Sequence, residues 1–200
     1  EALKHAGYAN DADVKVKLVS AVEIEEKGAE TVLSNFKGLL IPGGSGERGI
    51  EGKLKAAEYA RLNDVPFLAI DNGLEVAAIE FAKNVMGLED ATSREFDEQA
   101  KVNIIDIMES QKSVADKDGT NRLGLYTCKL VDGTKAREIY GVEETAERHR
   151  HRFEFNNKFK KDFEDNGMVF SGVNPESELV EIAELPNNNF YVAVQFHPDF

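Results

Sequence analysis

Apolar and polar residues recur along this chain with two periods, which predict strands and helices in turn. In the first half, apolar or alternating runs that predict strands lie at residues 14–19, 38–41 and 66–70. Helical spacing is found at residues 1–7, 21–33, 51–62 and 74–86, with Gly87 as the expected C-cap of the last helix. Because strands alternate with helices of this length, the first half predicts a parallel sheet with helices on both faces.

The second half is dominated by strands. Further segments that predict them lie at residues 102–108, 123–130, 135–140, 168–173, 179–184 and 190–195. Residues 156–166 predict a polar helix that ends at Gly167. No repeat or linker divides the chain, so residues 1–200 are expected to form a single α/β domain. We expect a three-layer sandwich with a mostly parallel central sheet flanked by helices, plus a smaller antiparallel set of strands in the second half.

Composition and charge narrow the functional classes. An apolar fraction of 42% favours a globular fold, and a formal net charge of -13 argues against nucleic-acid or anionic-membrane partners, which need a basic face. The sequence has no run of 18 apolar residues that would predict a membrane span. A single cysteine, Cys128, excludes an internal disulfide and favours the cytoplasm. Because the chain starts at Glu1, inside an expected helix, we expect a fragment of a longer polypeptide.

The stretch from Pro66 to Glu75 predicts the most informative local structure. A short apolar strand stops at Ile70, turns, and enters an amphipathic helix. A turn of this kind lifts one side chain above the end of a sheet, and hydrolases place a nucleophile there. The projected residue is Asp71, where a cysteine or serine is usual, and Gly73 suits the tight packing of the turn. The pattern therefore predicts a nucleophile elbow that carries an unusual residue.

Two further stretches follow predicted strands and can line the same cleft. The glycine-rich residues 42–46 can point backbone N–H groups at an oxyanion or a phosphate, or they can form a plain turn. They lack the Lys-Ser/Thr ending of a Walker loop, so a nucleotide-phosphate site is weakly indicated. His197, with Asp199 two positions on, fits the base and orienting acid of a catalytic triad. A histidine before a proline at a strand end is equally often structural.

Two other features favour structural interpretations. Residues 148–152 alternate arginine and histidine, so one set of side chains can face a cleft and the other solvent; taken alone, the run favours a solvated face. Cys128 lies inside an alternating strand, without a turn or helix start that would lower the pKa of its thiol. We interpret Cys128 as a buried structural cysteine.

Longer motifs carry a family resemblance that covers nearly all 200 residues. They are PGGSGERGIEGK at 42–53, FAKNVMGLEDATSREF at 81–96, NRLGLYTCKL at 121–130, ERHRHRFEFNN at 147–157 and QFHPDF at 195–200. With these motifs the chain resembles the glutaminase domain of the CTP synthases, which are class I glutamine amidotransferases. The resemblance implies the fold of that class and an N-terminal ATP-dependent synthase domain in the longer chain.

The resemblance also implies roles. In the family a Cys-His-Glu triad hydrolyses L-glutamine, and the ammonia passes to the synthase domain, which uses ATP and Mg²⁺ to aminate UTP to CTP in pyrimidine biosynthesis; the glutaminase domain itself needs no cofactor or metal. By analogy His197 is the base, Asp199 takes the place of the family's glutamate, and Gly44 supplies an oxyanion N–H. Glu95 and Arg152 match the positions that hold glutamine's head group. The lid loop on which the activator GTP acts matches Arg48, Gly49, Glu51, Gly52 and Lys53.

The chain departs from the family at the elbow. The family sequence Gly-Ile-Cys-Leu-Gly-Met-Gln becomes Ala-Ile-Asp-Asn-Gly-Leu-Glu at residues 69–75. Asp71 stands in place of the thiol, Asn72 in place of the leucine whose N–H completes the oxyanion hole, and Glu75 in place of a glutamine that contacts the substrate. A carboxylate is a poor nucleophile toward an unactivated amide.

Three hypotheses follow from this departure. The first is a degenerate glutaminase domain within a CTP synthase-like protein, with ammonia taken from solution. The second is a hydrolase that uses Asp71 as nucleophile with His197 and Asp199 activating water. The third is a non-catalytic ligand-binding or regulatory module that keeps the old pocket. The sequence favours the first.

Overall fold

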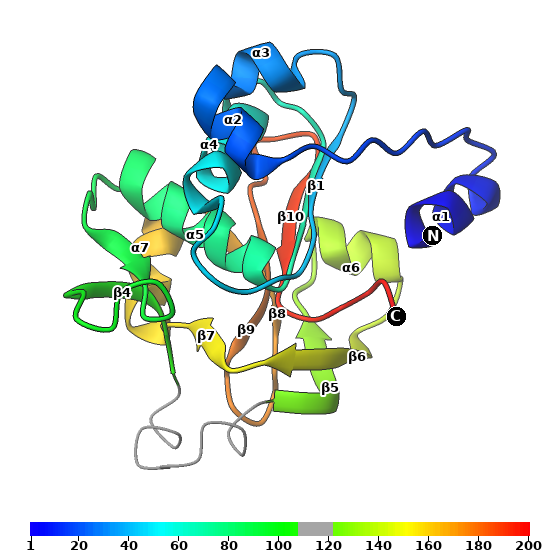
Figure 1. Cartoon of the computed structure of the whole chain (residues 1–200). Coiled ribbons are helices and arrows are strands. Elements are labelled where there is room, and N and C mark those ends of the chain that lie inside the picture. Colours follow the sequence, from blue (N-terminus) through cyan, green and yellow to red (C-terminus); the bar gives the residue numbers. More distant parts are fainter. Residues whose placement is uncertain (108–121) are drawn as a thin grey trace.

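The described part of the chain folds around two β-sheets. The structure, a computed structural model, describes residues 1–107 and 122–200. Within these residues the main sheet has the strand order β1-β2-β10-β9-β8-β5-β6 and the smaller sheet the order β3-β4-β7 (Figure 1). The strands of the main sheet are β1 (Leu39–Ile41), β2 (Phe67–Ile70), β10 (Tyr191–Val194), β9 (Val180–Glu184), β8 (Val169–Val173), β5 (Arg122–Leu130) and β6 (Glu144–His151). Those of the smaller sheet are β3 (Ala91–Ser93), β4 (Val102–Ile107) and β7 (Phe153–Phe155).

Strand directions are mixed in both sheets. β2 runs parallel to β1 and to β10, whereas the pairs β10-β9, β9-β8, β8-β5 and β5-β6 are antiparallel. In the smaller sheet β4 runs parallel to β3 and antiparallel to β7. The predicted α/β class is confirmed, but the expectation of a mostly parallel main sheet is wrong. Strands β8, β9 and β10 follow one another through short connections, and short connections join antiparallel neighbours.

Helices cover both faces of the main sheet. They are α1 (Ala2–Ala9), α2 (Ala21–Lys27), α3 (Ala29–Leu33), α4 (Ile50–Leu62), α5 (Asn72–Asn84), α6 (Lys135–Tyr140), the 3-10 turn η3 (Asn157–Phe159) and α7 (Lys160–Asp165). Helices α4, α5 and α7 share one hydrophobic cluster with β2, β9 and β10. Helix α6 joins a second cluster, which contains Cys128 and the opposite-facing residues of the same strands. The three-layer arrangement is therefore as the sequence predicts.

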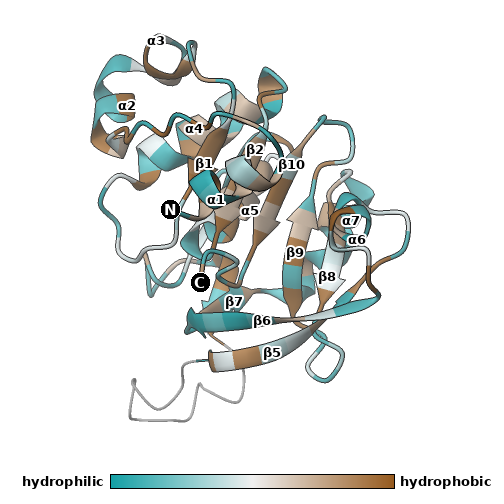
Figure 2. Cartoon of the chain, turned by 90° about the vertical axis from the view of Figure 1, so that its right-hand side faces the viewer, coloured by the Kyte–Doolittle hydropathy of each residue, from teal (hydrophilic) through white to brown (hydrophobic). Residues whose placement is uncertain are grey.

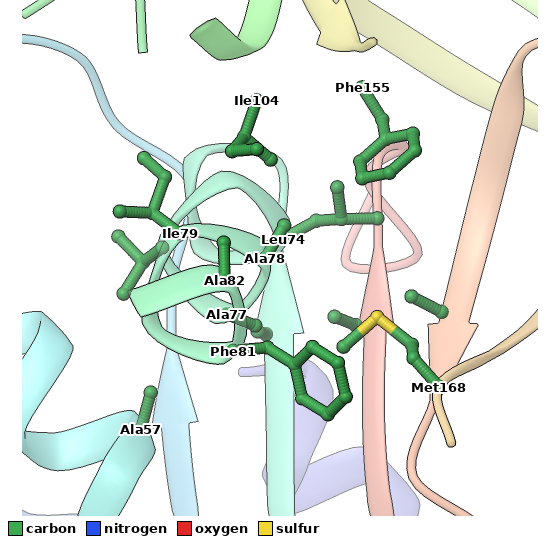
Figure 3. Packing of buried hydrophobic residues seen from close by; sticks show 14 of the residues in the cluster. Ala57, Leu74, Ala77, Ala78, Ile79, Phe81, Ala82, Ile104, Phe155 and Met168 are labelled. Atoms are coloured by element: carbon green, nitrogen blue, oxygen red, sulfur yellow. The ribbon is translucent and has the colours of Figure 1, made fainter. Parts of the chain in front are cut away.

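Helix α5 is the best-buried helix and carries the elbow at its start. Every residue from Asn72 to Ala82 is buried. Its apolar side chains pack between the main sheet and the smaller sheet, with Phe81 close to Met168 (Figure 3). The Phe81 ring stacks on Phe163 of α7 at a centroid distance of 5.5 Å. Apolar residues gather on the central strands, whereas β6 is hydrophilic (Figure 2). This packing holds the N-terminus of α5, and with it the elbow, in one position.

The predicted strand at residues 14–19 is not formed. The segment runs in an extended path between α1 and α2 (Figure 1), and it pairs with no strand among the residues that the structure describes. Val16 is 50% exposed and Leu18 is 93% exposed. An alternating pattern indicates a strand only where a neighbouring strand supplies hydrogen bonds and one face is covered. Neither condition is met at residues 14–19, so this prediction is wrong.

Other predicted boundaries change for local reasons. The helix expected at 21–33 is interrupted at Gly28, whose φ of 84° no helical residue adopts, and it becomes α2 and α3. Helix α5 ends at Asn84 with Val85 as C-cap, not at Gly87. The strand expected at 135–140 is wrong: these residues form α6, because the Thr134 side chain caps it and the Glu184 carboxylate accepts the N–H groups of Lys135 and Ala136.

The remaining predicted elements lie within one or two residues of those observed. Met108, the last residue of the strand predicted at 102–108, and Asn121, the first residue of the motif at 121–130, lie outside the described residues. Strands β3, β6 and β7 were not predicted as strands. In the described part of the chain, no helix has the length and apolar character needed to cross a bilayer.

Candidate functional site

The site is built around the elbow between β2 and α5. Asp71 occupies it with φ 54° and ψ −112°, a conformation that L-residues seldom adopt. The surrounding backbone enforces this geometry, since the Asp71 N–H donates to Val194 O at 2.7 Å and its carbonyl accepts from the Leu74 N–H at 2.9 Å. A Cβ on Gly73 would lie 2.8 Å from Ile41 O, so only glycine fits this close approach. The predicted strand–turn–helix is therefore present.

The imidazole ring of His197 lies between the carboxyl groups of Asp71 and Asp199. The Asp71 side chain is nearly buried, and its Oδ2 lies 3.8 Å from His197 Nε2. The other ring nitrogen, His197 Nδ1, lies 3.4 Å from Asp199 Oδ1. A Cβ on Gly43 would lie 2.6 Å from His197 Cε1, so the glycine loop is packed against the imidazole ring. The structure thus brings together an elbow residue, a histidine and an orienting carboxylate, which is the arrangement of a triad.

The carboxyl group of Asp71 lies against the glycine loop. Its Oδ2 accepts the backbone N–H of Gly44 at 3.4 Å, the donor that the resemblance assigns to the oxyanion hole. Burial raises the pKa of Asp71, against the opposing effects of the Asn72 N–H, His197 and the Gly44 N–H. An acid held in this way competes with any ligand oxygen for the same N–H.

Three acidic side chains and one ammonium group converge beside the elbow. Glu75 is 3% exposed, and burial, followed by the charges of Glu95 and Asp71, raises its pKa well above the ordinary value. Glu95 accepts the Gly46 N–H at 3.0 Å, which fixes it against the glycine loop. Lys53 Nζ donates to Asn72 Oδ1 at 2.7 Å. Burial lowers the pKa of Lys53, whereas the three carboxyl groups act to raise it.

The predicted lid loop is largely helical. Helix α4 begins at Ile50, so Glu51, Gly52 and Lys53 belong to its first turn, and Gly49 is its N-cap with φ 79°. A Cβ on Gly52 would lie 1.9 Å from Ala21 O, which shows that this turn is packed against the start of α2. Only Arg48 and Gly49 lie outside the helix. The helical turn at Glu51, Gly52 and Lys53 agrees with the helix predicted over residues 51–62, and contact with α2 stabilises it; the lid role of the five positions stays a prediction.

The arginine–histidine run lies on β6 and its end. His149 and His151 are buried, whereas Arg148 and Arg150 are exposed, so the two sets face opposite sides as the alternation predicts. The run also contacts the candidate triad, since the His197 N–H donates to Arg148 O at 2.8 Å. Arg152 follows β6, half-buried, with its guanidinium carbon 5.9 Å from the centroid of the Phe153 ring.

The sequence did not predict the buried polar cluster around Arg122, but it predicted the burial of Cys128. Arg122, Glu154 and Glu181 form a buried ionic cluster with the two histidines. The available signal was a glutamate in the middle of the apolar segment 179–184. Cys128 is fully buried, and burial raises the pKa of its thiol to about 12, which fits the predicted structural role. Among the residues that the structure describes, no group of three or more histidine, cysteine or acidic side chains is arranged to hold a metal ion.

The comparisons with known proteins agree with this geometry. The family model for class-I glutamine amidotransferases matches residues 1–200, and the chain belongs to that family. Within the family its similarity is to CTP synthases. It is 53% identical over 201 residues to the CTP synthase of Lactiplantibacillus plantarum and 52% identical over 200 residues to that of Bacillus subtilis. Both alignments cover 100% of this chain but 37% of the relative, so the chain spans little more than a third of their length.

Solved structures give the same result. The glutaminase domain of Trypanosoma brucei CTPS with bound acivicin superposes with a TM-score of 0.91 at 33% sequence identity, over 98% of this chain and 77% of that one. A glutamine amidotransferase from Thermotoga maritima superposes with a TM-score of 0.59 at 12% identity, over 98% of this chain and 68% of that one; this likeness shows the fold alone. The predicted class I amidotransferase-like fold is therefore confirmed.

Proposed function

We propose that this chain is the glutaminase-type domain of a CTP synthase-like protein and that its own glutamine-hydrolysing step has been lost. Asp71 takes the place of the nucleophilic cysteine. The observation that carries the proposal is the hydrogen bond from the Gly44 N–H to Asp71 Oδ2. The change removes the attacking thiol and, in the same step, fills the oxyanion site with a carboxylate of the protein itself.

The size of the loss follows from general values. Removing a triad nucleophile lowers kcat by about 10⁶, or roughly 8 kcal/mol of barrier. Losing one oxyanion donor costs a further factor of about 10² to 10³ where the effects are independent. Both losses act in the same direction. His197 and Asp199 remain within reach of the elbow, which supports descent from an active glutaminase.

In the parent protein we propose that a synthase domain, with ATP and Mg²⁺, aminates UTP with ammonia from solution. GTP acting at Arg48 and the start of α4 belongs to the same proposal. These roles rest on the similarity to CTP synthases.

A second candidate, a non-catalytic ligand-binding module, is favoured by one observation. The side chains of Glu75 and Asn72 are buried beside each other, and apart from each other Glu75 Oε2 and Asn72 Nδ2 have no hydrogen-bond partner within the described part of the chain. Buried polar atoms with hydrogen-bonding capacity to spare suit a bound polar molecule. With Asp71 and Glu95 nearby, the ligand would be cationic. Calorimetric titration with glutamine and with a primary diamine separates this candidate from an empty site.

The proposed loss is tested by restoring the family elbow. Purified protein should release no glutamate from L-glutamine above the buffer rate, and the triple variant Asp71→Cys, Asn72→Leu, Glu75→Gln should release it. His197→Ala added to the triple variant is the matched control and should abolish the gained activity. Turnover by the unmodified chain that disappears in Asp71→Asn would instead support a hydrolase with Asp71 as nucleophile, and it would contradict the proposal.

A further inference from the structure

A buried polar network adjoins the candidate triad and involves strands β5, β6, β7 and β9. Arg122 Nη2 donates to Glu181 Oε1 at 2.8 Å, and Arg122 Nη1 donates to Glu154 Oε1 at 3.2 Å. His149 Nε2 lies 3.2 Å from Glu181 Oε2, and His149 Nδ1 lies 2.7 Å from His151 Nε2. The exposed fractions of these five residues lie between 0% and 8%. Water therefore cannot supply missing hydrogen-bond partners from bulk, and the hydrogen atoms must be distributed within the network.

The hydrogen positions on the two histidines follow from their partners. His151 Nδ1 lies 3.1 Å from the carbonyl oxygen of Phe153, and a carbonyl can only accept, so Nδ1 carries the hydrogen. Burial, followed by the charge of Arg122, lowers the pKa of His151 to about 3 and that of His149 to about 2. Both rings are therefore neutral at pH 7. His151 Nε2 then carries a lone pair and accepts the hydrogen of His149 Nδ1. Because His149 is neutral, its Nε2 carries no hydrogen.

Two acceptors consequently face each other. His149 Nε2 presents a lone pair to Glu181 Oε2, and neither atom makes any other hydrogen bond to the described residues. Two acceptors at 3.2 Å in the protein interior repel unless a proton lies between them. Glu154 has different surroundings: its Oε1 and Oε2 lie 3.2 and 3.5 Å from Arg122 Nη1, and Oε1 lies 3.6 Å from His151 Nδ1. Its neighbours are donors, which favour an ionised carboxylate.

With both histidines neutral, one proton in this pair of acids balances the charge of the cluster. Arg122 is the guanidinium that both carboxyl groups share, and one positive charge neutralises one carboxylate. Burial raises the pKa of both acids, that of Glu154 to about 8, so the pair readily holds a proton at pH 7. The partners of each carboxyl group decide which acid carries it: donors surround Glu154, whereas a lone pair of His149 faces Glu181. We propose that Glu181 is the protonated acid, donating Oε2–H to His149 Nε2, while Glu154 stays ionised against Arg122. The proposal assigns a hydrogen-bond chain that runs from Arg122 through Glu181, His149 and His151 to Phe153 O.

The hydrogen-bond chain ends at the backbone around Arg152. Arg152 lies between His151 and Phe153, the two residues joined by the last hydrogen bond. The hydrogen-bond chain therefore fixes the backbone on both sides of Arg152. The same strand supplies Arg148 O, which holds the His197 N–H at 2.8 Å. Glu181, His149 and His151 are therefore positioning residues for Arg152 and His197. The use of Arg152 for a ligand's head group rests on the proposed function; the position of the proton does not.

Two matched glutamine variants test where the proton lies. Glutamine has the shape of a protonated glutamate, so Glu181→Gln can still donate to His149 and accept from Arg122, whereas Glu154→Gln removes the counter-charge of Arg122. In urea unfolding, Glu181→Gln should change the unfolding equilibrium constant by less than about threefold. Glu154→Gln should raise it by about ten- to a hundredfold. The reverse order, equal losses, or no loss in either variant would overturn the assignment.

Nuclear magnetic resonance decides the same question without a variant that must fold. At pH 7 the Glu181 carboxyl carbon should have the shift of a protonated acid, and both histidines should show the neutral pattern with hydrogen on Nδ1. An imidazolium at His149, or a protonated Glu154 with an ionised Glu181, would refute the proposal.

The positioning role has its own readout. The Arg152 Nε–H resonance should stay in place in Glu181→Gln and shift in Glu181→Leu, which has a similar size but cannot donate. If it stays in place in both, the network does not position Arg152. An inactive triple elbow variant would sink the proposed function and leave these spectra unchanged, so the two failures are distinguishable.

Discussion

A thiol placed at the elbow should be far more reactive than the chain's own cysteine. In Asp71→Cys the new thiol sits at the N-terminus of the 13-residue helix α5 and takes the place of a carboxyl whose oxygen lies 3.8 Å from His197 Nε2. A helix N-terminus and a neighbouring imidazole both stabilise a thiolate, and we expect them to outweigh the burial that raises the pKa of Asp71 at this position, so the pKa of the thiol should fall below the ordinary value of about 8.5. The variant therefore tests whether the frame around Asp71 still activates a nucleophile.

The magnitude follows from the two thiol pKa values. Burial raises the pKa of Cys128 to about 12. At pH 7.5 its thiolate fraction is therefore about 3,000-fold below that of a thiol with an ordinary pKa of about 8.5. The greater nucleophilicity of the more basic thiolate recovers a factor of about 30, which leaves at least about a hundredfold in favour of residue 71. The complete burial of the Cys128 side chain adds to the difference.

The assay is alkylation by iodoacetamide between pH 6 and 9, with the modified residue located by mass spectrometry. Asp71→Cys should react with one equivalent at residue 71, with an apparent pKa below 8.5, and the unmodified chain should not react on this timescale. Adding His197→Ala should raise the apparent pKa of the thiol. Labelling of Cys128 at a similar rate, or a pH profile that His197→Ala leaves unchanged, would refute the reasoning.

Three further predictions concern stability. Because the pKa of Glu75 is raised on folding, the folded chain keeps a proton that the unfolded chain releases above the ordinary pKa near 4.5. The free energy of unfolding should therefore fall as the pH rises from about 4.5 towards the pKa of Glu75 in the folded chain. Glu75→Gln should flatten that part of the curve of stability against pH, and parallel curves for the two proteins would contradict the assignment. Gly73→Ala places a Cβ 2.8 Å from Ile41 O and 3.0 Å from Ala69 Cβ, and thermal unfolding should show a loss of about 1–3 kcal/mol, with an unchanged Tm counting against the tight elbow. Glu184→Ala leaves the N–H groups of Lys135 and Ala136 without their acceptor and should cost about 1–3 kcal/mol in urea unfolding; a neutral result would show that Glu184 does not stabilise α6.

Much of the fold could be predicted from local patterns because the relevant signals are local. The runs before Pro42 and Asp71 are apolar and short, and each is followed by a helical pattern, which defines β1, α4, β2 and α5 within a few residues. Errors occur where a distant partner decides the outcome. Residues 14–19 alternate like a strand but find no neighbouring strand, and residues 135–140 form α6 because the carboxylate of Glu184, far along the chain, accepts its first N–H groups.

The candidate site divides in the same way. The elbow, the glycine loop and His197 are recognisable because each follows a strand end, and strand ends meet at one edge of a sheet. The position of Lys53 beside Asn72, and the helical turn that carries it, depend on the packing of α4 against α2. The roles of these residues in a reaction remain predictions that the elbow variants test.

The sequence alone predicted the class of the chain and placed Asp71, rather than a thiol, at its elbow, because residue identity at a strand–turn–helix junction needs no long-range information. Only the tertiary structure showed that the Asp71 carboxyl accepts a hydrogen bond from the Gly44 N–H. It also showed that Arg122, Glu154, Glu181 and two histidines form one buried cluster. Those facts depend on distances between residues far apart in the chain, where burial strengthens electrostatic interactions and removes the water that would otherwise satisfy each group.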